Sequence, residues 1–238
     1  MSTPAVADRF RSWMDTGTAL FTTSVERLPD ADLAAVTRLP GWSRRHVVAH
    51  VGLNAEALRR LVRWASTGEP SAMYASPDQR AREIEDAATW QAHRLRRFVE
   101  DTAAQLAADL DGLPDDRWTA EVVTAQGRTV AATEIPWLRT REVSVHAVDL
   151  GAGADFEDLP EELCAALVTD IARLRSARGR DTALELRSGD HGWSVSGAGT
   201  PTQISGSPAA LARWLTGRGT AGITIVNHET MPALSPWL

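Results

Sequence analysis

The apolar positions in the first half of the chain recur at the spacing of amphipathic helices. Residues 4–27 carry one such stripe, which predicts a helix with a single buried face. Ser43 is a suitable N-cap for a second helix over 44–67. The same periodicity predicts a third helix over 78–110 and a fourth over 133–150.

β-prone residues replace the helical pattern between the third and fourth predicted helices. Two short runs in 121–130 flank Gln126-Gly127, which predicts a hairpin, although Gln-Gly is a weaker turn signal than Asn-Gly. We therefore expect an antiparallel four-helix bundle with a hairpin inserted before its last helix.

The segment Gly151-Ala152-Gly153-Ala154 marks the expected boundary between two domains, 1–153 and 154–238. Beyond it the pattern changes to helices at 159–177 and 207–217 and short strands at 183–188, 192–196, 201–205 and 222–226. The fold class that this pattern predicts is α+β, with a helical bundle followed by a small α+β domain.

Composition removes several classes of function. All 25 basic residues among the 238 are arginine, which excludes lysine Schiff bases and phosphate-loop lysines. A net charge of −6 without a basic tract argues against nucleic acid as a partner. No apolar run approaches the roughly 20 residues that cross a bilayer, and the N-terminal residues do not resemble a secretory signal. We therefore expect a cytoplasmic protein with no membrane partner.

The chain has one cysteine, Cys164, which rules out an internal disulfide and a cysteine-rich metal site. Its neighbours have the pattern of the packed face of a helix, so we expect a buried small hydrophobic residue and not a nucleophile. Any thiol chemistry must then use a sulfur atom from outside the chain.

Two pairs of side chains have the spacing of metal ligands on a helix. Glu142 and His146 are four residues apart on the fourth predicted helix, as are His46 and His50 on the second. One carboxylate and two imidazoles with an open fourth position form the ligand set of a catalytic zinc site. The same spacing is also common in solvated ion pairs, but nearby valines put Glu142 in a packed setting, where an unpaired carboxylate is costly.

Spacing alone does not decide whether His46 or His50 joins Glu142 and His146. His50 has apolar neighbours, whereas His46 follows two arginines near the helix start, so we expect the ligands His50, Glu142 and His146. Zinc fits this set, and iron, nickel and cobalt also suit it. The other three histidines lack such a partner and are expected at the surface: His93, His191 and His228.

Several segments of the first 150 residues have a distinctive order and spacing along the chain. They are Gly41-Trp42-Ser43, Ala49-His50-Val51 with Asn54, Met73-Tyr74-Ala75-Ser76-Pro77 ending at Arg80, Thr124-Ala125-Gln126-Gly127-Arg128-Thr129, and Trp137-Leu138-Arg139-Thr140-Arg141-Glu142 running into His146-Ala147-Val148-Asp149-Leu150. In these segments the chain resembles the mycothiol-dependent maleylpyruvate isomerases. The histidine and glutamate elements alone would indicate only the broader DinB-like superfamily of metal-binding bundles. The segments at Arg80 and 126–128 narrow the resemblance to the isomerase branch of that superfamily.

This resemblance implies a DinB-like four-helix bundle that binds zinc through His50, Glu142 and His146. It also implies mycothiol, a low-molecular-weight thiol of certain bacteria, as a second cofactor. The implied reaction is the cis–trans isomerisation of maleylpyruvate to fumarylpyruvate in gentisate-type aromatic catabolism. We expect a small dicarboxylate substrate, and a monomer is the simplest expectation.

The mechanism that we hypothesise begins with a thiolate, because the thiolate and not the thiol is the nucleophile. Its addition to the cis double bond leaves a single bond that can rotate, and elimination then restores a trans alkene. A thiol bound to the metal is deprotonated at neutral pH, which supplies the attacking species.

Three side chains are candidates for holding the substrate or the thiol. We expect Arg80 to bind a substrate carboxylate, because a guanidinium binds a carboxylate through two parallel hydrogen bonds. A surface ion pair with Asp78 or Glu83 is the alternative for Arg80. Arg128 is a second candidate for anion binding. Asn54, one turn beyond His50, either orients a ligand or makes a plain buried hydrogen bond.

Two other functions remain open on the same scaffold. A mycothiol-dependent S-transferase in detoxification would consume the thiol instead of returning it. A metal-binding stress or regulatory module would have no turnover and a metal site closed to exchangeable ligands.

Overall fold

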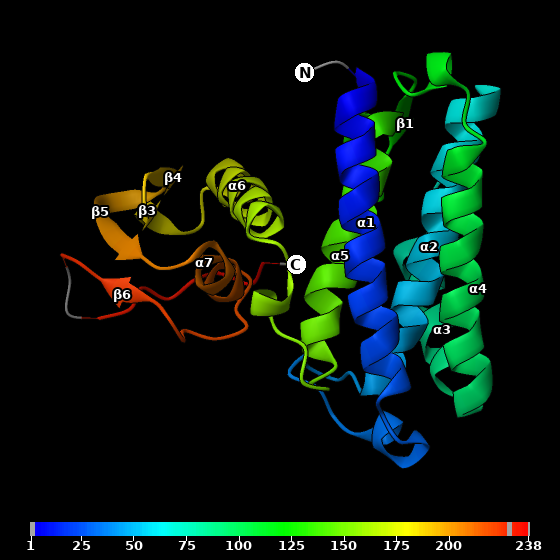
Figure 1. Ribbon diagram of the computed structural model, residues 1–238, viewed down its shortest axis with the longest axis horizontal. Helices are drawn as coiled ribbons and strands as arrows, with labels where there is room; N and C mark the ends of the chain where they lie inside the picture. The colour runs from blue at the N-terminus through cyan, green and yellow to red at the C-terminus, as the bar shows by residue number, and fades with distance from the viewer. Residues whose placement is uncertain (1–2, 228–229, 238) are drawn as a thin grey trace. The chain divides into compact units, whose positions relative to one another are not determined.

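The computed structural model describes residues 3–227 and 230–237, so His228 lies outside the described residues. The chain forms two compact units, Met1–Ala154 and Asp155–Leu238. The first is a bundle of helices and the second combines two helices with a small sheet (Figure 1). The predicted fold class, a helical bundle followed by a small α+β domain, is confirmed.

The described residues of the first unit form five α-helices: α1 (Thr3–Glu26), α2 (Arg44–Thr67), α3 (Pro77–Ala88), α4 (Ala92–Asp111) and α5 (Ile135–Asp149). Short 3-10 turns accompany them at η1 (Asp30–Ala34), η2 (Asp115–Arg117) and η3 (Ala132–Glu134). The first, second and fourth predicted helices are confirmed to within two residues at each end.

The third predicted helix, 78–110, is wrong as a single element, because the chain breaks between α3 and α4. The hydroxyl of Thr89 donates to the carbonyl of Asp86 and ends α3, and Gln91 has the extended backbone of an N-cap (φ −59°, ψ 145°). Trp90 fills the corner, with its ring edge-on to Phe98 at 5.1 Å between centroids. No glycine or proline marks this break, so the periodicity gave no sign of it.

The break changes the direction of the helices, and the predicted antiparallel arrangement is wrong for two neighbouring pairs. Helix α3 runs antiparallel to α2 and returns the chain to the end where α2 began. Helix α4 therefore runs parallel to α2, as the pairing of Gly52 with Phe98 and of Arg59 with Gln105 shows. Figure 1 shows these two helices side by side.

Helices α1 and α5 are also parallel neighbours (Figure 1). The Thr140 hydroxyl lies 3.5 Å from the carbonyl of Phe10, and further along both helices Gly17 packs against Ser144. A Cβ atom on Gly17 would come within 2.7 Å of the Ser144 hydroxyl, so only glycine allows this close approach. By contrast, α2 and α5 run antiparallel, and this pair carries the residues of the candidate site.

The predicted hairpin before the last helix is confirmed. Strand β1 (Glu121–Val123) pairs antiparallel with β2 (Thr129–Ala131), with Val122 opposite Val130. Gly127 in the connecting loop has a positive φ of 76°, a conformation that glycine adopts without strain.

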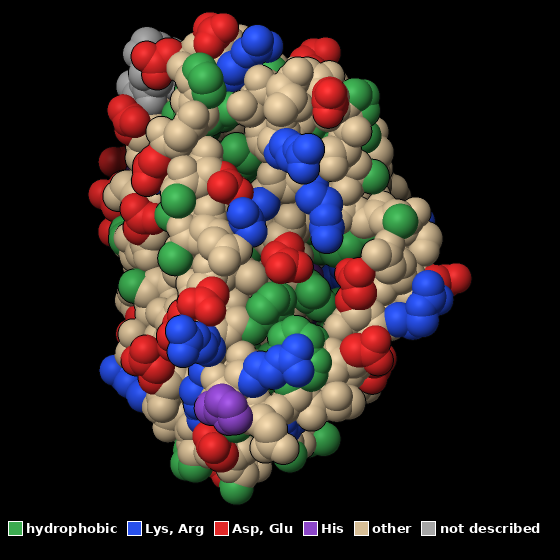
Figure 2. All heavy atoms as spheres, turned by 90° about the vertical axis from the view of Figure 1, so that its right-hand side faces the viewer, with side chains coloured by type: hydrophobic (Ala, Val, Ile, Leu, Met, Phe, Trp, Pro, Cys, Tyr) green, Lys and Arg blue, Asp and Glu red, His purple; other side chains and the backbone are tan. Residues whose placement is uncertain are grey.

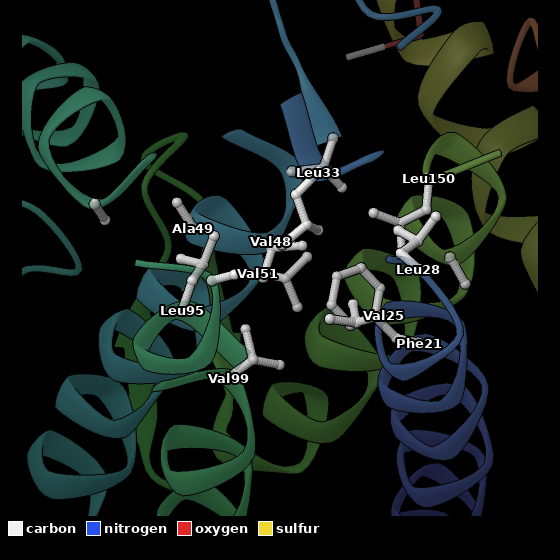
Figure 3. Close-up of a cluster of buried hydrophobic side chains, with 14 of the residues drawn as sticks. Phe21, Val25, Leu28, Leu33, Val48, Ala49, Val51, Leu95, Val99 and Leu150 are labelled. Atoms are coloured by element: carbon white, nitrogen blue, oxygen red, sulfur yellow. The ribbon is translucent and has the colours of Figure 1, made fainter. Parts of the chain in front are cut away.

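One apolar cluster fills the end of the bundle that contains the candidate site. Figure 3 shows Phe21 and Val25 from α1 turned toward Val48 and Val51 from α2. His50 lies between Ala49 and Val51, which are both fully buried, so its backbone is held by packing on rigid elements.

The second unit places α6 (Glu161–Arg178) and α7 (Pro208–Leu215) with a sheet of order β4-β3-β5-β6. The strands are β3 (Thr182–Ser188), β4 (His191–Val195), β5 (Ala198–Ser205) and β6 (Thr224–Ile225), and η4 (Phe156–Asp158) precedes α6. Strands β3 and β5 are parallel, and the other two pairs are antiparallel. All six predicted elements of this region are confirmed.

Cys164 on α6 is fully buried, and its thiol donates to the carbonyl of Phe156 at 3.3 Å. Burial raises the pKa of this thiol to about 12. The prediction that Cys164 is buried is therefore confirmed, and the raised pKa disfavours the reactive thiolate.

Acidic and basic side chains are intermixed on the face of the molecule in Figure 2. Among the described residues, no helix combines the length and apolar character that crossing a membrane requires. His93 and His191 are exposed, as predicted.

Candidate metal centre

The structure brings His50, Glu142 and His146 together, although they come from two helices. His50 is on α2, and Glu142 and His146 leave α5 one turn apart on the face toward α2. One potential ligand atom from each residue lies within 4.8 Å of the other two. Oε2 of Glu142 is 2.9 Å from Nε2 of His50 and 3.4 Å from Nε2 of His146.

These three side chains are largely shielded from solvent. Their exposed fractions are 5% for His50, 19% for Glu142 and 14% for His146. Burial by itself raises the pKa of Glu142, but its hydrogen bonds with His146 and His50 outweigh burial and hold that pKa well below the usual value. Glu142 is therefore a negatively charged carboxylate throughout the physiological pH range, with lone pairs available to a metal.

The two imidazoles differ in their pKa values. Burial lowers the pKa of His50 from 6.5 to about 4, even though Glu142 acts in the opposite direction. Burial also acts to lower the pKa of His146, but its hydrogen bonds with Asp149 and Glu142 raise it above 6.5. His50 is therefore neutral at pH 7, whereas His146 retains its proton to higher pH.

The Nδ1 atoms of the two imidazoles have different hydrogen-bond partners. Nδ1 of His146 lies 2.9 Å from Oδ2 of Asp149, whose side chain is fully buried. Nδ1 of His50 instead lies 3.2 Å from Nη2 of Arg80 on α3. A guanidinium only donates hydrogen bonds, so His50 Nδ1 accepts this one and carries its own proton on Nε2, toward Glu142.

Two aromatic rings line the same region. The Trp42 ring lies 5.3 Å from the His50 ring between centroids. The guanidinium carbon of Arg80 lies 5.6 Å from the centre of the Tyr74 ring, which is close enough for a cation–π contact. Arg80 thus faces His50 and Tyr74, and Glu83 accepts a hydrogen bond from Gln79 instead.

Arg139 on α5 ties the two helices together beside the three side chains. It is fully buried, and its Nη1 atom donates to the carbonyl of Val51 at 2.6 Å and to Oδ1 of Asn54 at 3.0 Å. Burial lowers the pKa of Arg139 to about 10, so it remains a cation. Asn54 therefore makes the buried hydrogen bond that was one of its two predicted roles.

Two other residues considered from the sequence have different surroundings. Arg128 lies in the β1–β2 loop, 3.5 Å from Glu134. His46 is part of the capping box of α2, where its Nδ1 accepts from the backbone N–H of Ser43, and its Nε2 lies 3.2 Å from Glu85. These contacts occupy both ring nitrogens of His46, which leaves His50 as the histidine beside Glu142.

The residues present fit a divalent metal ion. Two imidazole nitrogens and one carboxylate oxygen converge within coordination reach of a single point, and zinc, iron, nickel and cobalt all accept this donor set. The buried carboxylate behind His146 is the partner that metal-binding histidines commonly have.

Comparison with known proteins identifies the family of this chain. The family model of the mycothiol maleylpyruvate isomerase N-terminal domain matches residues 14–151, more than half of the chain. The chain belongs to this family. This member also matches the crystal structure of the mycothiol-dependent maleylpyruvate isomerase at 35% identity, with a TM-score of 0.90, over 95% of this chain and 96% of that one.

A second solved structure gives the same values and is a variant of that isomerase in which one histidine is replaced by alanine. YfiT from Bacillus subtilis, described as a probable metal-dependent hydrolase with an unusual four-helix bundle topology, is 17% identical. That match covers 61% of this chain and 83% of YfiT with a TM-score of 0.52, so it shows the bundle fold alone. No curated protein matches the chain.

Sequence reasoning missed three residues of the site: Tyr74, Arg139 and Asp149. Asp149 follows His146 by three positions, which puts both on one helix face, and this signal could have found it. Arg139 precedes Glu142 by three positions in the same way, but arginine in a helix is ordinarily a surface residue. Tyr74 lies in a loop, and no spacing rule connects it to the helices.

Proposed function

We propose that this chain is a cis–trans isomerase that converts maleylpyruvate to fumarylpyruvate, with mycothiol and a divalent metal, zinc, as cofactors. The observation that carries the proposal is the convergence of His50, Glu142 and His146 in a chain that matches a maleylpyruvate isomerase over nearly its full length. We further propose a cytoplasmic enzyme of gentisate-type aromatic catabolism.

The donor set supports catalysis rather than a structural role for the metal. Structural zinc sites have four protein ligands, whereas catalytic sites keep three and leave a place for an exchangeable group. When bound, such a metal supplies a Lewis acid that stabilises the thiolate of mycothiol, the nucleophile for reversible addition to the substrate double bond. The chain itself has one cysteine, which is buried and has a raised pKa.

Arg80 is our candidate for binding a substrate carboxylate. It now donates to Nδ1 of His50, whose proton is on Nε2. For Nε2 to become a metal ligand, the neutral His50 ring must carry its proton on Nδ1 instead, and a protonated Nδ1 no longer accepts a hydrogen bond. A metal held at Nε2 of His50 would therefore leave the Arg80 guanidinium available to form a bidentate pair with a substrate carboxylate.

Two further side chains are candidates for contacts with the substrate or mycothiol. The side-chain oxygen of Asn54 accepts from Arg139, which leaves its amide N–H groups as donors toward a ligand. Arg128 is about one-third exposed and carries a second guanidinium that suits the other carboxylate of a dianion.

An absorbance assay of maleylpyruvate turnover tests this function. Purified protein with zinc and a small, substoichiometric amount of mycothiol should convert many equivalents of substrate, and all the free thiol should be recovered. No turnover with mycothiol present would refute the isomerase. Stoichiometric loss of thiol into a stable adduct would instead identify an S-transferase.

A further inference from the structure

The two nitrogens of the His146 ring face two different carboxylates. Nε2 points to Glu142 and belongs to the three potential ligand atoms, whereas Nδ1 lies 2.9 Å from Oδ2 of Asp149. The Asp149 side chain has no exposed surface. An ionised carboxylate accepts only, so the short contact requires that Nδ1 carries the proton and donates.

The position of Asp149 is unfavourable for the helix. It is the last residue of α5, where the backbone carbonyls give the helix end a partial negative charge that repels a carboxylate. Burial adds a desolvation cost. Asp149 cannot cap this helix end, because the open groups there are carbonyls and an ionised carboxylate has no proton to donate to them. Arg44 supplies the donors, to the carbonyls of Leu150 at 2.6 Å and Gly151 at 3.1 Å.

We propose that Asp149 is a positioning residue that prepares His146 to bind the metal. By accepting from Nδ1, it fixes the tautomer in which Nε2 presents its lone pair, and it fixes the ring orientation. His50 has no carboxylate that accepts from its Nδ1, because the group next to its Nδ1 is the Arg80 guanidinium. This inference rests on the proposed metal site and assigns Asp149 a role outside the ligand set.

The expected effect is on metal affinity. Removal of a carboxylate behind a metal-binding histidine typically weakens metal binding about 10- to 100-fold. Asp149→Asn keeps the shape and one acceptor oxygen but removes the charge, so we expect a loss of about tenfold. Asp149→Ala removes both and should lose about 100-fold.

The experiment is a zinc competition titration against a chromophoric chelator, with wild type and both variants first stripped of metal. A cobalt(II) titration adds the visible absorption bands of the bound ion, which report the geometry of its ligands. Glu85→Gln is the matched control, because it alters a histidine–carboxylate contact of 3.2 Å at His46, outside the three potential ligands. We expect zinc affinity and cobalt bands to change in both Asp149 variants and to remain unchanged in Glu85→Gln.

Equal zinc affinity in wild type and both Asp149 variants would overturn the inference while leaving the metal site intact. Failure of wild type to bind zinc would overturn the proposed function itself, and this inference with it. Should the variants fold poorly, zinc-loaded wild type still provides a test by nuclear magnetic resonance. We expect a His146 Nδ1–H proton signal that is protected from solvent exchange, and a His146 ring without a proton on Nδ1 would contradict the role of Asp149.

Discussion

Nε2 of His50 and Oε2 of Glu142 lie 2.9 Å apart, although 92 positions separate the two residues in the chain. The contact spans the antiparallel interface of α2 and α5, and Arg139 bridges the same two helices beside it. The site therefore depends on the packing of these helices and not on a local motif. Substitutions on α2, α3 and α5 should therefore distinguish the residues that bind the metal from those that hold the helices or the substrate.

Replacement of any of the three converging side chains should abolish metal binding and isomerase activity together. His50→Ala, Glu142→Ala and His146→Ala each remove one of three protein ligands, and the remaining two do not hold zinc against a chelator. Metal analysis and turnover of each purified variant measure the effect. His46→Ala is the matched control and should retain metal, whereas a metal-free His46→Ala with a fully loaded His50→Ala would reverse the assignment.

Replacement of Arg80 should affect the substrate and not the metal. Arg80→Met removes a charged hydrogen-bond donor worth about 2–3 kcal/mol, which corresponds to a loss of roughly 30- to 150-fold in kcat/KM. Zinc affinity should remain or rise, because His50 Nδ1 loses the donor that faces it in the metal-free protein. Steady-state kinetics and zinc titration of the same preparation check both statements, and unchanged kcat/KM would exclude Arg80 as the carboxylate ligand.

Arg139 should contribute to stability through its bonds across α2 and α5. Arg139→Met leaves Oδ1 of Asn54 buried without its donor, at an expected cost of about 1–3 kcal/mol in the free energy of unfolding. Urea unfolding of metal-free protein measures this cost. Arg97→Met is the control, since Arg97 is 80% exposed and its pair with Asp101 should contribute at most about 0.5 kcal/mol. Similar losses in both variants would argue against the bridging role.

Zinc affinity should depend on pH through His146. Its pKa is raised above 6.5, so below that pKa the metal must displace a proton, and apparent affinity falls about tenfold for each pH unit. Above the pKa of His146 the affinity should level off. His50, with a pKa of about 4, adds no further slope above that pH. Chelator competition from pH 5 to 8 measures the profile, and an affinity independent of pH across this range would contradict it.

Helical periodicity predicted the long helices because each buries one continuous apolar face, as α1 and α2 do. It failed at 89–91, where Thr89 and Trp90 end one helix through a side-chain bond and ring packing that have no spacing signature. Because the break was not predicted, the parallel direction of α2 and α4 was not predicted either. Helix direction depends on where the chain turns, and a periodic pattern is the same in either direction.

For the site, spacing identified Glu142 with His146, because two residues one turn apart share a helix face. The choice of His50 over His46 depended on apolar neighbours, and the structure gives a physical reason for it in the capping contacts of His46. The approach of Arg80 to His50 was beyond sequence reasoning, since it follows from the packing of α3 against α2. The metal-binding and catalytic roles of these residues remain predictions.

Metal-dependent catalysis is tested most directly by comparing isomerisation of maleylpyruvate before and after removal of the metal, with mycothiol in excess. We predict that chelator-stripped protein loses turnover, that added zinc restores it, and that zinc does not restore it in His50→Ala. Full-speed conversion of the cis to the trans acid by protein shown to contain no metal would rule out a catalytic role for the ion.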